Sequence, residues 1–485
     1  DQITDFFIPT VGVKQGDNLS STLFNIYVNN LVSQFNNTCD PVTIGKSKVS
    51  CLLYADDLVL LSETPIGLQN SLNIVSNYCQ LWKLEINHDK SKILIFESKK
   101  SKCQYTFVID STTLERVYQY KYLGIVFSYT GNQAQAKEDL YLRSQKAYFK
   151  LRKLLGVDYI KPKLYLDIFD KTVVPILTYG SEVWATFNQH TKRYKDFKSP
   201  NYLYEDFVGE KLHTKLCKIL LGVNSKTSNT ACRAELGRYP IMINALVNMI
   251  TYRSRLENLD TNDLVRDSFN DDILLDSYGL SNWYSCTNEI LRITNNNQTL
   301  LLKSNKVVRK IITKSLKSSY DSFFRDNLFN DSRNDENEKN KLRTFRKFKN
   351  TIKYEPYLNL NMKKETLNYF SQFRLSAHKL QIELARHIKV PKEQRNHQKL
   401  LVRKCKCCNS NDDEDELHFM MECHTYRNER EAFLNEIHDM CRNTSNLSNE
   451  NLFIWLLSNE DINIMTKTIK FIYKCFQVKK HRFQL

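Results

Sequence analysis

The chain is poor in the residues that make tight turns, with only 12 glycines and 9 prolines among 485 residues. A sandwich or barrel of many short strands needs turn signals at short intervals, so this scarcity favours long helices over such folds. Long apolar runs are also missing. No stretch of about 18 apolar residues occurs, and the sequence therefore predicts no membrane-spanning helix. Hydrophobic residues still make up 41% of the chain, which is enough for sizeable buried cores.

Acidic residues are in the minority, since 54 Asp and Glu face 70 Lys and Arg and leave a formal net charge of +16. A basic excess of this size predicts a polyanionic partner, most simply nucleic acid. The 13 cysteines are scattered and form no compact, even framework. This pattern is typical of a reducing intracellular compartment, in which free thiols or metal ligands are expected rather than disulfides.

Two adjacent aspartates, Asp56 and Asp57, stand between two short apolar runs in the segment Cys51–Leu61. Each run has the length of a strand, and the acidic pair falls where a tight turn would lie. Such a hairpin holds two carboxylates side by side, and their mutual repulsion calls for a compensating charge. A divalent cation such as Mg²⁺ supplies it in phosphoryl and nucleotidyl transfer. An ordinary polar turn is the alternative, because aspartate is common in turns.

The segments around this pair carry a family resemblance. In chain order they are Gly12–Ser20, Leu23–Asn25, Tyr54–Asp57, Leu84–Lys92 and Tyr120–Ile125. In this order and at these distances they resemble the later palm motifs of reverse transcriptases, in the variant of non-LTR (LINE-type) retrotransposons. The resemblance to the palm covers about the first 130 residues, and a further resemblance to the family's C-terminal region continues almost to the end of the chain.

The resemblance implies an RNA-directed DNA polymerase that copies element RNA into DNA at a target site by two-metal nucleotidyl transfer. Asp56 and Asp57 would be its catalytic, Mg²⁺-binding carboxylates. The family works with an RNA template and a DNA primer or target, in cytoplasmic ribonucleoprotein and in the nucleus. Its palm also carries a third catalytic aspartate on an earlier strand, after the fingers, whereas this sequence starts only a few residues before Gly12. We therefore expect a truncated, inactive chain; a dead copy that only binds nucleic acid, or a relic, is the alternative to an enzyme.

Further positions take their roles from the same resemblance. Gln15 and Gly16 would approach the template and the incoming nucleotide, unless the glycines only shape a turn. Tyr54 would pack beside the nucleotide or the primer end. Lys90 could meet the triphosphate, or be a solvated lysine in a basic stretch. A hairpin that holds the primer end is implied for Tyr122, Leu123 and Gly124. Buried strand packing would explain Tyr122 and Leu123 equally well.

Near the end of the sequence, Cys405, Cys408, His418 and Cys423 follow the spacing Cys-x₂-Cys-x₉-His-x₄-Cys. Three thiolates and one imidazole suit a tetrahedral, structural Zn²⁺ site. Cys407 is a spare thiol that could replace Cys408, and coincidental cysteines are the alternative. The flanking stretches Phe373–Leu380 and Glu414–Phe419 resemble those around the family's C-terminal CCHC element.

Two charged runs in this region allow simpler interpretations. The basic run Lys341–Tyr354 contains no acidic residue before its end and has interleaved aromatics. It could track a phosphate backbone and stack on bases, or it could be a solvated helix face with Phe345 and Phe348 buried. The acidic run Asp412–Glu416 is predicted to be a solvated loop within the zinc element.

The sequence thus predicts an α/β partial polymerase palm followed by a mainly α-helical thumb and C-terminal region with a small zinc knuckle. Within the palm, helices are expected at Ser20–Phe35 and Pro65–Leu84, and strands at 92–97 and 121–127. One face of the first helix should carry Leu23, Ile26, Tyr27, Asn30 and Leu31, and the stripe of the second Leu68, Leu72, Val75, Cys79 and Trp82. The expected parts are the palm (1–130), the thumb and its connection (131–260), a helical linker with a polar tract (261–340) and the basic region with the zinc element (341–485).

Overall fold

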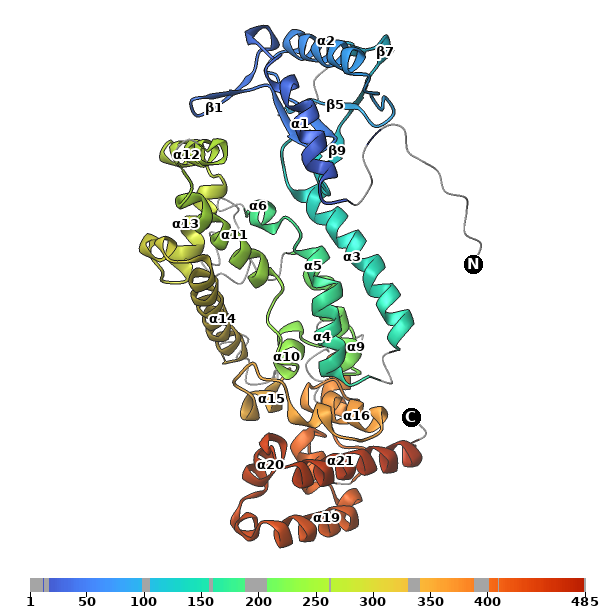
Figure 1. Cartoon of the computed structure of the whole chain (residues 1–485). Coiled ribbons are helices and arrows are strands. Elements are labelled where there is room, and N and C mark those ends of the chain that lie inside the picture. Colours follow the sequence, from blue (N-terminus) through green and yellow to red (C-terminus); the bar gives the residue numbers. More distant parts are fainter. Residues whose placement is uncertain are drawn as a thin grey trace, which may run out of the picture. The chain divides into compact units, whose positions relative to one another are not determined.

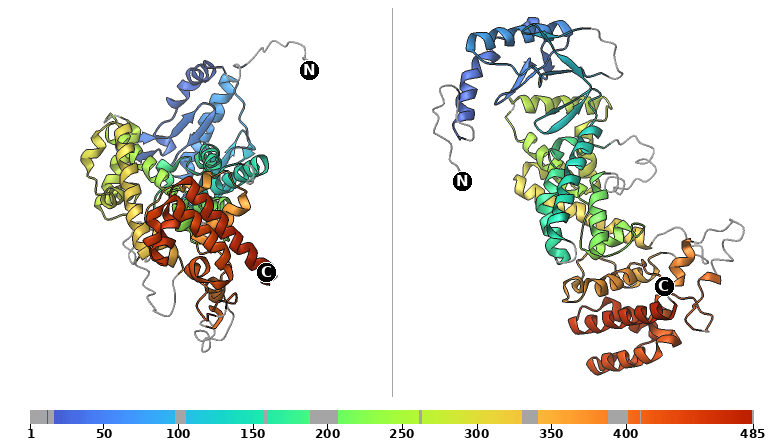
Figure 2. Two further views of the ribbon diagram at one scale, coloured as in Figure 1. Left: turned by 90° about the horizontal axis from the view of Figure 1, so that it is seen from below. Right: turned by 90° about the vertical axis from the view of Figure 1, so that its right-hand side faces the viewer.

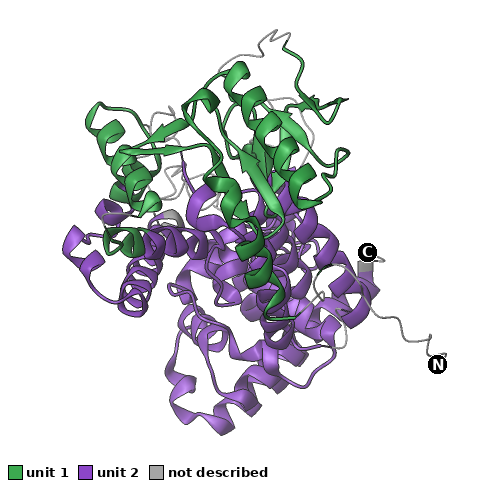
Figure 3. Ribbon diagram, turned by 45° about the horizontal axis from the view of Figure 1, so that its top comes forward, with its two compact units in different colours: residues 1–136, 253–288 green, residues 137–252, 289–485 purple. Residues whose placement is uncertain are grey.

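The structure is a computed structural model, and it describes Gly12 and residues 17–97, 105–156, 160–187, 207–260, 263–329, 341–387, 401–408 and 410–483. The chain divides into two compact units (Figure 3). Unit 1 comprises residues 1–136 and 253–288, and unit 2 comprises residues 137–252 and 289–485. Helices dominate the described residues, and every named strand among them lies in unit 1 (Figure 1). The helical majority predicted from the sequence is confirmed, whereas the four-part division of the chain stays a prediction.

The strands of unit 1 are short. They are β1 Val42–Ile44, β2 Ser47–Val49, β3 Cys51–Tyr54, β4 Asp57–Leu60, β5 Lys92–Leu94, β6 Val108–Ile109, β7 Thr112–Thr113, β8 Glu115–Val117, β9 Gln119–Tyr122 and β10 Ile125–Ser128. Among the described residues they form five two-stranded sheets, of which only β5–β8 is parallel. The predicted hairpin at 49–61 is confirmed as β3–β4. The stretch predicted as a strand at 121–127 is itself a hairpin, β9–β10.

The longer helices follow the sequence closely. In chain order they are α1 Ser20–Val32, α2 Pro65–Trp82, α3 Ala134–Leu155, α4 Pro162–Thr172, α9 Gly209–Leu220, α10 Asn229–Glu235, α11 Met242–Glu257, α12 Leu264–Ser277, α13 Trp283–Ile293, α14 Asn305–Phe329, α15 Arg343–Phe348, α16 Lys364–Arg374, α19 Arg427–Met440, α20 Asn449–Ser458 and α21 Ile462–Phe483. Single turns of helix are α5 Val174–Leu177, α6 Ser181–Trp184 and α17 Gln381–Leu384. None of the described helices is both long and apolar enough to cross a lipid bilayer.

Helix α2 organises the core of unit 1. The Thr64 hydroxyl accepts a hydrogen bond from the Gly67 N–H at 3.0 Å and caps its start, and Lys83 adopts the left-handed conformation at its end. The predicted apolar stripe is confirmed, because its members are buried or pack against the core. This core contains Leu31, Leu72, Val75, Tyr78, Ile93, Phe107, Ile109 and Leu114. It backs the β3–β4 hairpin, since Leu58 and Leu60 pack against the same cluster.

The predicted apolar face of α1 is only partly covered. The predicted helix is confirmed, and Leu31 on this face is buried, but Leu23 and Ile26 are 52% and 68% exposed. Periodicity shows which side of a helix prefers an apolar neighbour, but burial needs that neighbour to be present. In the described part of unit 1 it comes from α2, where the Tyr78 hydroxyl donates to the Tyr27 carbonyl at 3.0 Å.

In unit 2 the helices are interrupted at glycines, because α9 ends just before Leu221–Gly222 and α10 and α11 flank Gly237–Pro240. The predicted polar tract at 331–340 lies outside the described residues. Towards the end of the chain, α21 packs against α16, α19 and α20, and Figure 2 shows these C-terminal helices stacked on one another. The stack is filled with aromatic rings, such as those of Phe419 and Phe476, whose centroids lie 4.6 Å apart.

Candidate functional site

The β3–β4 hairpin presents the aspartate pair at its tip. Tyr54 pairs with Asp57 across the strands, so Ala55 and Asp56 form the two-residue turn. Such turns need a positive φ, which Ala55 adopts at +52° although it is not a glycine. A left-handed alanine costs roughly 1–2 kcal/mol. The hairpin therefore holds both carboxylates at its end at the expense of local strain.

The two faces of this hairpin differ. Side chains alternate along a strand, so Leu58 and Leu60 face the core while Tyr54 and Asp57 lie on the opposite face. Tyr54 is 64% exposed, and both Asp56 and Asp57 are exposed. Neither carboxylate has a hydrogen bond or an ion pair with another described residue. The oxygens of both are thus open to a hard cation or to solvent.

The predicted primer hairpin reaches this site. Its turn consists of Leu123 and Gly124, with φ of +45° and +82°, between β9 and β10. Burial, and in addition the nearby Asp57 carboxylate, raises the pKa of the Tyr122 hydroxyl. Asp57 and Tyr122, which are far apart in the sequence, are therefore neighbours in the fold.

The remaining predicted positions are only partly placed. Lys90 is exposed, and its carbonyl accepts a hydrogen bond from the Tyr120 hydroxyl at 3.1 Å, which ties its loop to the β9–β10 hairpin. Gln15 and Gly16 lie outside the described residues. The structure thus brings Tyr54, Asp56 and Asp57 together at the hairpin tip with Tyr122 near Asp57, and ties the backbone of Lys90 to the β9–β10 hairpin.

A second cluster lies in unit 2. The ligand atoms of Cys405, Cys408, His418 and Cys423 all lie within 4.8 Å of one another. The Sγ atoms of Cys405 and Cys423 are 3.9 Å apart, and Cys408 Sγ lies 3.4 Å from His418 Nε2. With Zn–S and Zn–N bonds of about 2.3 and 2.0–2.1 Å, a tetrahedral site has S–S and S–N edges of about 3.8 and 3.6 Å. The spacing of these four residues fits that geometry.

The spare thiol of Cys407 points elsewhere. Its Sγ lies 3.5 Å from Glu414 Oε1 and 3.6 Å from the Tyr426 hydroxyl. It is grouped with Cys405 and Glu414, not with His418 and Cys423. The geometry therefore favours Cys408 as the fourth ligand of the cluster.

Acidic groups lie close to His418. The backbone N–H of His418 donates to Asp415 Oδ1 at 2.9 Å, and Nδ1 lies 3.7 Å from Glu422 Oε2. Burial acts to lower the pKa of His418, but the sulfurs of Cys405 and Cys408 raise it to about 9. A metal bound by Nε2 would take the place of that proton. Acidic groups near the other ring nitrogen are the usual partners of a metal-binding histidine.

Two members of the acidic run before His418 are buried, so the prediction of a solvated loop is wrong for them, whereas Asp412 is exposed. Glu414 and Glu416 are 1% and 0% exposed. Glu414 accepts hydrogen bonds from Lys479 Nζ at 2.5 Å and from the Gln381 N–H at 2.8 Å. The physical reason is pairing, because the buried Glu414 and Glu416 meet the cations Lys479 and Arg343, which come from other segments.

Glu416 is the centre of a network that the sequence interpretation missed. It pairs with Arg343 and accepts hydrogen bonds from Thr344 at 3.0 Å and from His378 Nε2 at 2.8 Å. Burial alone would raise the pKa of the Glu416 carboxyl, but Arg343 and His378 hold it well below its usual range. His378 and Ser376 belong to the stretch that resembles the family's C-terminal element. Two acids at a spacing of two before a ligand histidine are the sequence signal for this network.

The basic run at 341–354 is engaged within the protein. Its cations pair with acidic side chains in Arg343–Glu383, Lys347–Glu450, Lys349–Glu355 and Lys353–Glu460. Phe345 is fully buried, and its ring contacts that of Phe348 at 5.5 Å. The burial of Phe345 agrees with the simpler of the two interpretations, but these cations are paired rather than solvated.

Comparison with known proteins shows which family and which relatives the sequence resembles. Residues 2–127 match the model of the family described as reverse transcriptase (RNA-dependent DNA polymerase). The chain is 33% identical, over 31% of its length, to the retrovirus-related Pol polyprotein of a type-2 retrotransposable element of Drosophila melanogaster, of which 16% is covered. It is 31% identical, over 35% of its length, to the corresponding polyprotein of a type-1 retrotransposable element of Popillia japonica, of which 24% is covered.

A putative uncharacterized transposon-derived protein of Caenorhabditis elegans is 32% identical over 28% of the chain, and 49% of that protein is covered. The chain thus spans less than half the length of each of these relatives. The matched region includes the aspartate hairpin and the β9–β10 hairpin beside it. Residues 2–127 thus carry the match to the reverse transcriptase family, and the similarity to these polyproteins supports a reverse transcriptase of a non-LTR retrotransposon.

Proposed function

We propose that the chain serves RNA-directed DNA synthesis, in which a non-LTR retrotransposon copies its RNA into DNA at a target site. The observation that supports this most is the exposed pair Asp56 and Asp57 at a hairpin tip beside Tyr122, within the region that matches the reverse transcriptase family. An RNA template and a DNA primer or target would be its partners. Its place would be cytoplasmic ribonucleoprotein and the nucleus.

The chemistry of the aspartate pair fits Mg²⁺. The cation prefers oxygen ligands and is commonly bound by one or two carboxylates together with substrate phosphates. Asp56 and Asp57 offer such oxygens on an open surface, with no described side chain competing for them. Bound there, Mg²⁺ would help to activate the primer 3′-hydroxyl and to neutralise charge on the leaving pyrophosphate.

The neighbouring residues would position the substrates. Tyr54 shares the exposed face of Asp57 and can pack against the sugar of the nucleotide or the primer end. The turn of Leu123 and Gly124 can support the primer strand through its backbone. Lys90 would offer a point charge to the triphosphate. Gln15 and Gly16 are proposed to approach the template and the nucleotide.

The alternative function is nucleic-acid binding without polymerisation. One observation favours it. In the described part of the chain the hairpin stands as a two-stranded sheet, and it contributes only the two adjacent carboxylates. A two-stranded hairpin is marginally stable by itself and depends on what packs against it. The two functions differ in whether a bound primer is extended.

Primer extension separates them. The protein is tested with an RNA template, a DNA primer and Mg²⁺, and RNA binding is measured in parallel. Extension that Asp56→Asn removes while RNA binding stays within about twofold would support the enzyme. Binding of RNA without any extension by the unaltered protein would support the alternative. Loss of binding in Asp56→Asn would contradict the role as a metal ligand, because this change removes no basic contact.

We also propose that Cys405, Cys408, His418 and Cys423 hold one structural Zn²⁺. Four protein ligands would complete a tetrahedral site and leave no position for a substrate, which distinguishes a structural zinc site from a catalytic one. Elemental analysis of the purified protein tests this. One zinc per chain is expected, and a chain that folds without zinc would contradict the assignment.

A further inference from the structure

Helix α14 in unit 2 carries a row of lysines. Lys306, Lys310, Lys314 and Lys317 are all exposed. At 100° per residue, these positions fall within an arc of about 80° on one side of the helix. The apolar row of α14 lies on the opposite side, where Val308, Ile312 and Leu316 are buried. The helix is therefore anchored by one face and offers the lysines on the other.

These lysines are not neutralised within the described chain. From Asn305 to Tyr320 the helix contains no Asp or Glu. None of Lys306, Lys310 and Lys314 forms an ion pair or a hydrogen bond in the described structure. Like charges at a spacing of four residues destabilise a helix by roughly 0.2–0.5 kcal/mol per pair. The row thus carries a repulsion that a bound polyanion would relieve.

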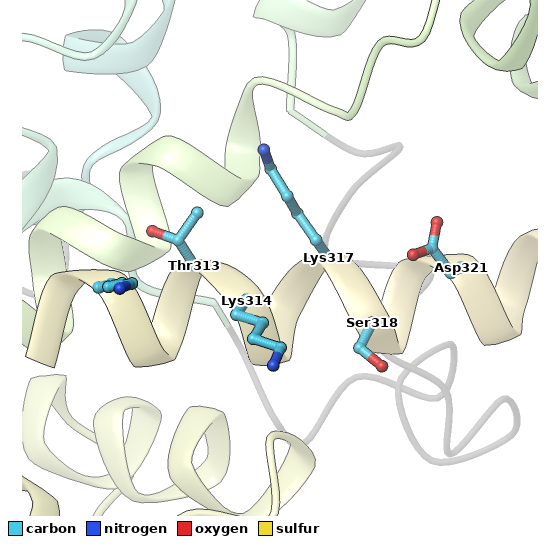
Figure 4. A pocket seen from close by; sticks show the side chains of 6 residues that line it. Thr313, Lys314, Lys317, Ser318 and Asp321 are labelled. Carbon is cyan, nitrogen blue, oxygen red and sulfur yellow. The ribbon is translucent and has the colours of Figure 1, made fainter. Parts of the chain in front are cut away.

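The surface between these side chains is hollowed. Lys310, Thr313, Lys314, Lys317, Ser318 and Asp321 line a shallow hollow of about 470 Å³ (Figure 4). Figure 4 shows Thr313 and Lys317 on one edge of the helix and Lys314 and Ser318 on the other. Two hydroxyl groups are therefore interleaved with the ammonium groups. Lysines and hydroxyl side chains are common donors to phosphate oxygens.

The single acid of the hollow is already engaged. The Tyr239 hydroxyl donates to both Asp321 oxygens, at 3.0 and 3.2 Å. Lys317 Nζ lies 4.9 Å from the centre of the Tyr239 ring, which steadies this lysine at the end of the row. Asp321 is thus hydrogen-bonded to Tyr239, while Lys306, Lys310 and Lys314 stay available to a ligand.

We propose that this lysine face of α14, formed by Lys306, Lys310, Lys314 and Lys317, binds the phosphodiester backbone of a nucleic-acid strand without reading its sequence. The row spans twelve residues and therefore eleven rises of about 1.5 Å, or roughly 16 Å, which matches several consecutive phosphates. Lysine is a point charge on a flexible stem, so it contacts phosphate rather than the edges of bases. The proposal rests on the proposed function, which supplies the nucleic acid.

The contrast within unit 2 supports this choice of surface. Three other lysines at the surface of the unit are paired, namely Lys347 with Glu450 at 2.5 Å, Lys353 with Glu460 at 2.6 Å, and the half-exposed Lys467 with Glu436. Binding of a polyanion by these lysines would first have to break an ion pair. On α14 no such exchange is needed.

The test compares two triple variants with the same change in net charge. One variant replaces Lys306, Lys310 and Lys314 by Gln, and the control replaces Lys347, Lys353 and Lys467 by Gln. The affinity for single-stranded RNA is measured as a function of salt concentration. Each phosphate contact on a single strand contributes about 0.7 to the slope of log affinity against log salt. The α14 variant should lower the slope by about 2, and the control should leave it unchanged.

Further arms make the outcome decisive. Replacing the three α14 lysines by Arg should keep the affinity, and two RNAs of unrelated sequence should respond alike to the Gln variant. Three results would overturn the proposal. The RNA affinity could fall equally in both Gln variants, it could stay unchanged in the α14 Gln variant, or it could fall as much in the α14 Arg variant as in the α14 Gln variant. If the unaltered protein does not bind RNA, the proposed function fails as well. If the unaltered protein binds RNA and the α14 Gln variant binds it equally well, this inference fails and the proposed function stands.

Discussion

The two candidate metal sites of the chain are built in opposite ways. Asp56 and Asp57 stand exposed at the tip of a two-stranded hairpin, with no described side chain bound to their oxygens. The cluster of Cys405, His418 and Cys423 is buried, with Cys408 half-buried beside them, and the acidic groups of Asp415 and Glu422 lie next to His418. One site is open on the side where a substrate would approach, and the other is closed.

This difference separates two uses of a metal. A site that works on a substrate must leave coordination positions for it, so the protein supplies only part of the ligands. A structural site supplies all four ligands and gains folding free energy from them. The folding of unit 2 should therefore depend on metal, whereas the folding of unit 1 should not.

The largest effect is expected from removing zinc. Apparent binding free energies of structural Zn²⁺ in zinc-finger peptides are about 10–16 kcal/mol. A strong chelator, or Cys423→Ser, should therefore unfold the segment around residues 401–426 and expose it to limited proteolysis. Asp56→Asn should leave that proteolysis pattern unchanged. If the segment resisted protease after complete zinc removal, its folding would not depend on the metal, and the prediction would be contradicted.

The next effect concerns activity alone. Metal ions contribute several kcal/mol of transition-state stabilisation, and each 1.36 kcal/mol corresponds to a factor of ten in rate. In a protein that extends primers, Asp56→Asn should therefore reduce the rate by about 10³-fold, while the temperature of unfolding shifts by less than a few degrees. The rate is measured by single-nucleotide extension. A rate within tenfold of the unaltered protein would show that Asp56 does not hold the metal.

A smaller effect is expected from the buried network of Glu416, two residues before His418. Removing one partner of a buried charge pair costs roughly 3–5 kcal/mol, so Glu416→Gln should destabilise the fold by about this amount at pH 7. The pKa of Glu416 is lowered in the folded state. Its contribution is therefore present above the unfolded pKa of about 4.3 and is lost as the pH falls towards the folded value.

Urea unfolding from pH 3 to pH 7 measures this contribution. The difference in the free energy of unfolding between the unaltered protein and Glu416→Gln should shrink as the pH falls below about 4.3. Lys353→Gln, which removes an exposed ion pair with Glu460, is the matched control and should cost less than about 1 kcal/mol. A difference for Glu416→Gln that is independent of pH would show that its charge is not what stabilises the network.

The sequence predicts those features that depend on local pattern. The hairpin of Asp56 and Asp57, the apolar stripe of α2 and the breaks around α10 follow from alternation, helical periodicity and glycine or proline positions. The spacing of the four zinc ligands also needs no tertiary information, because it lies within 19 consecutive residues.

Features that depend on distant partners could not be predicted. The basic run at 341–354 contains no acidic residue. Its Lys353 and Lys347 nevertheless form ion pairs with Glu460 and Glu450, which lie about a hundred residues later in the sequence. The burial of Glu416 likewise depends on its pairing with Arg343 and His378, which belong to other segments of the chain. In α1 the helix follows from periodicity, but the exposure of Leu23 and Ile26 depends on which segments pack against that face.

The smallest effect decides between two adjacent thiols. Cys407→Ser should keep one zinc per chain and lower the free energy of unfolding by about 1 kcal/mol or less, because it alters only weak contacts with Glu414 and Tyr426. Cys408→Ser should lose most of the metal, since its Sγ is one corner of the tetrahedron. Zinc stoichiometry and the chelator concentration at half-removal measure both variants. If Cys407→Ser releases the metal and Cys408→Ser retains it, the roles of the two thiols are exchanged; the site then closes on the side of Glu414, and the buried Lys479–Glu414 pair becomes part of its surroundings.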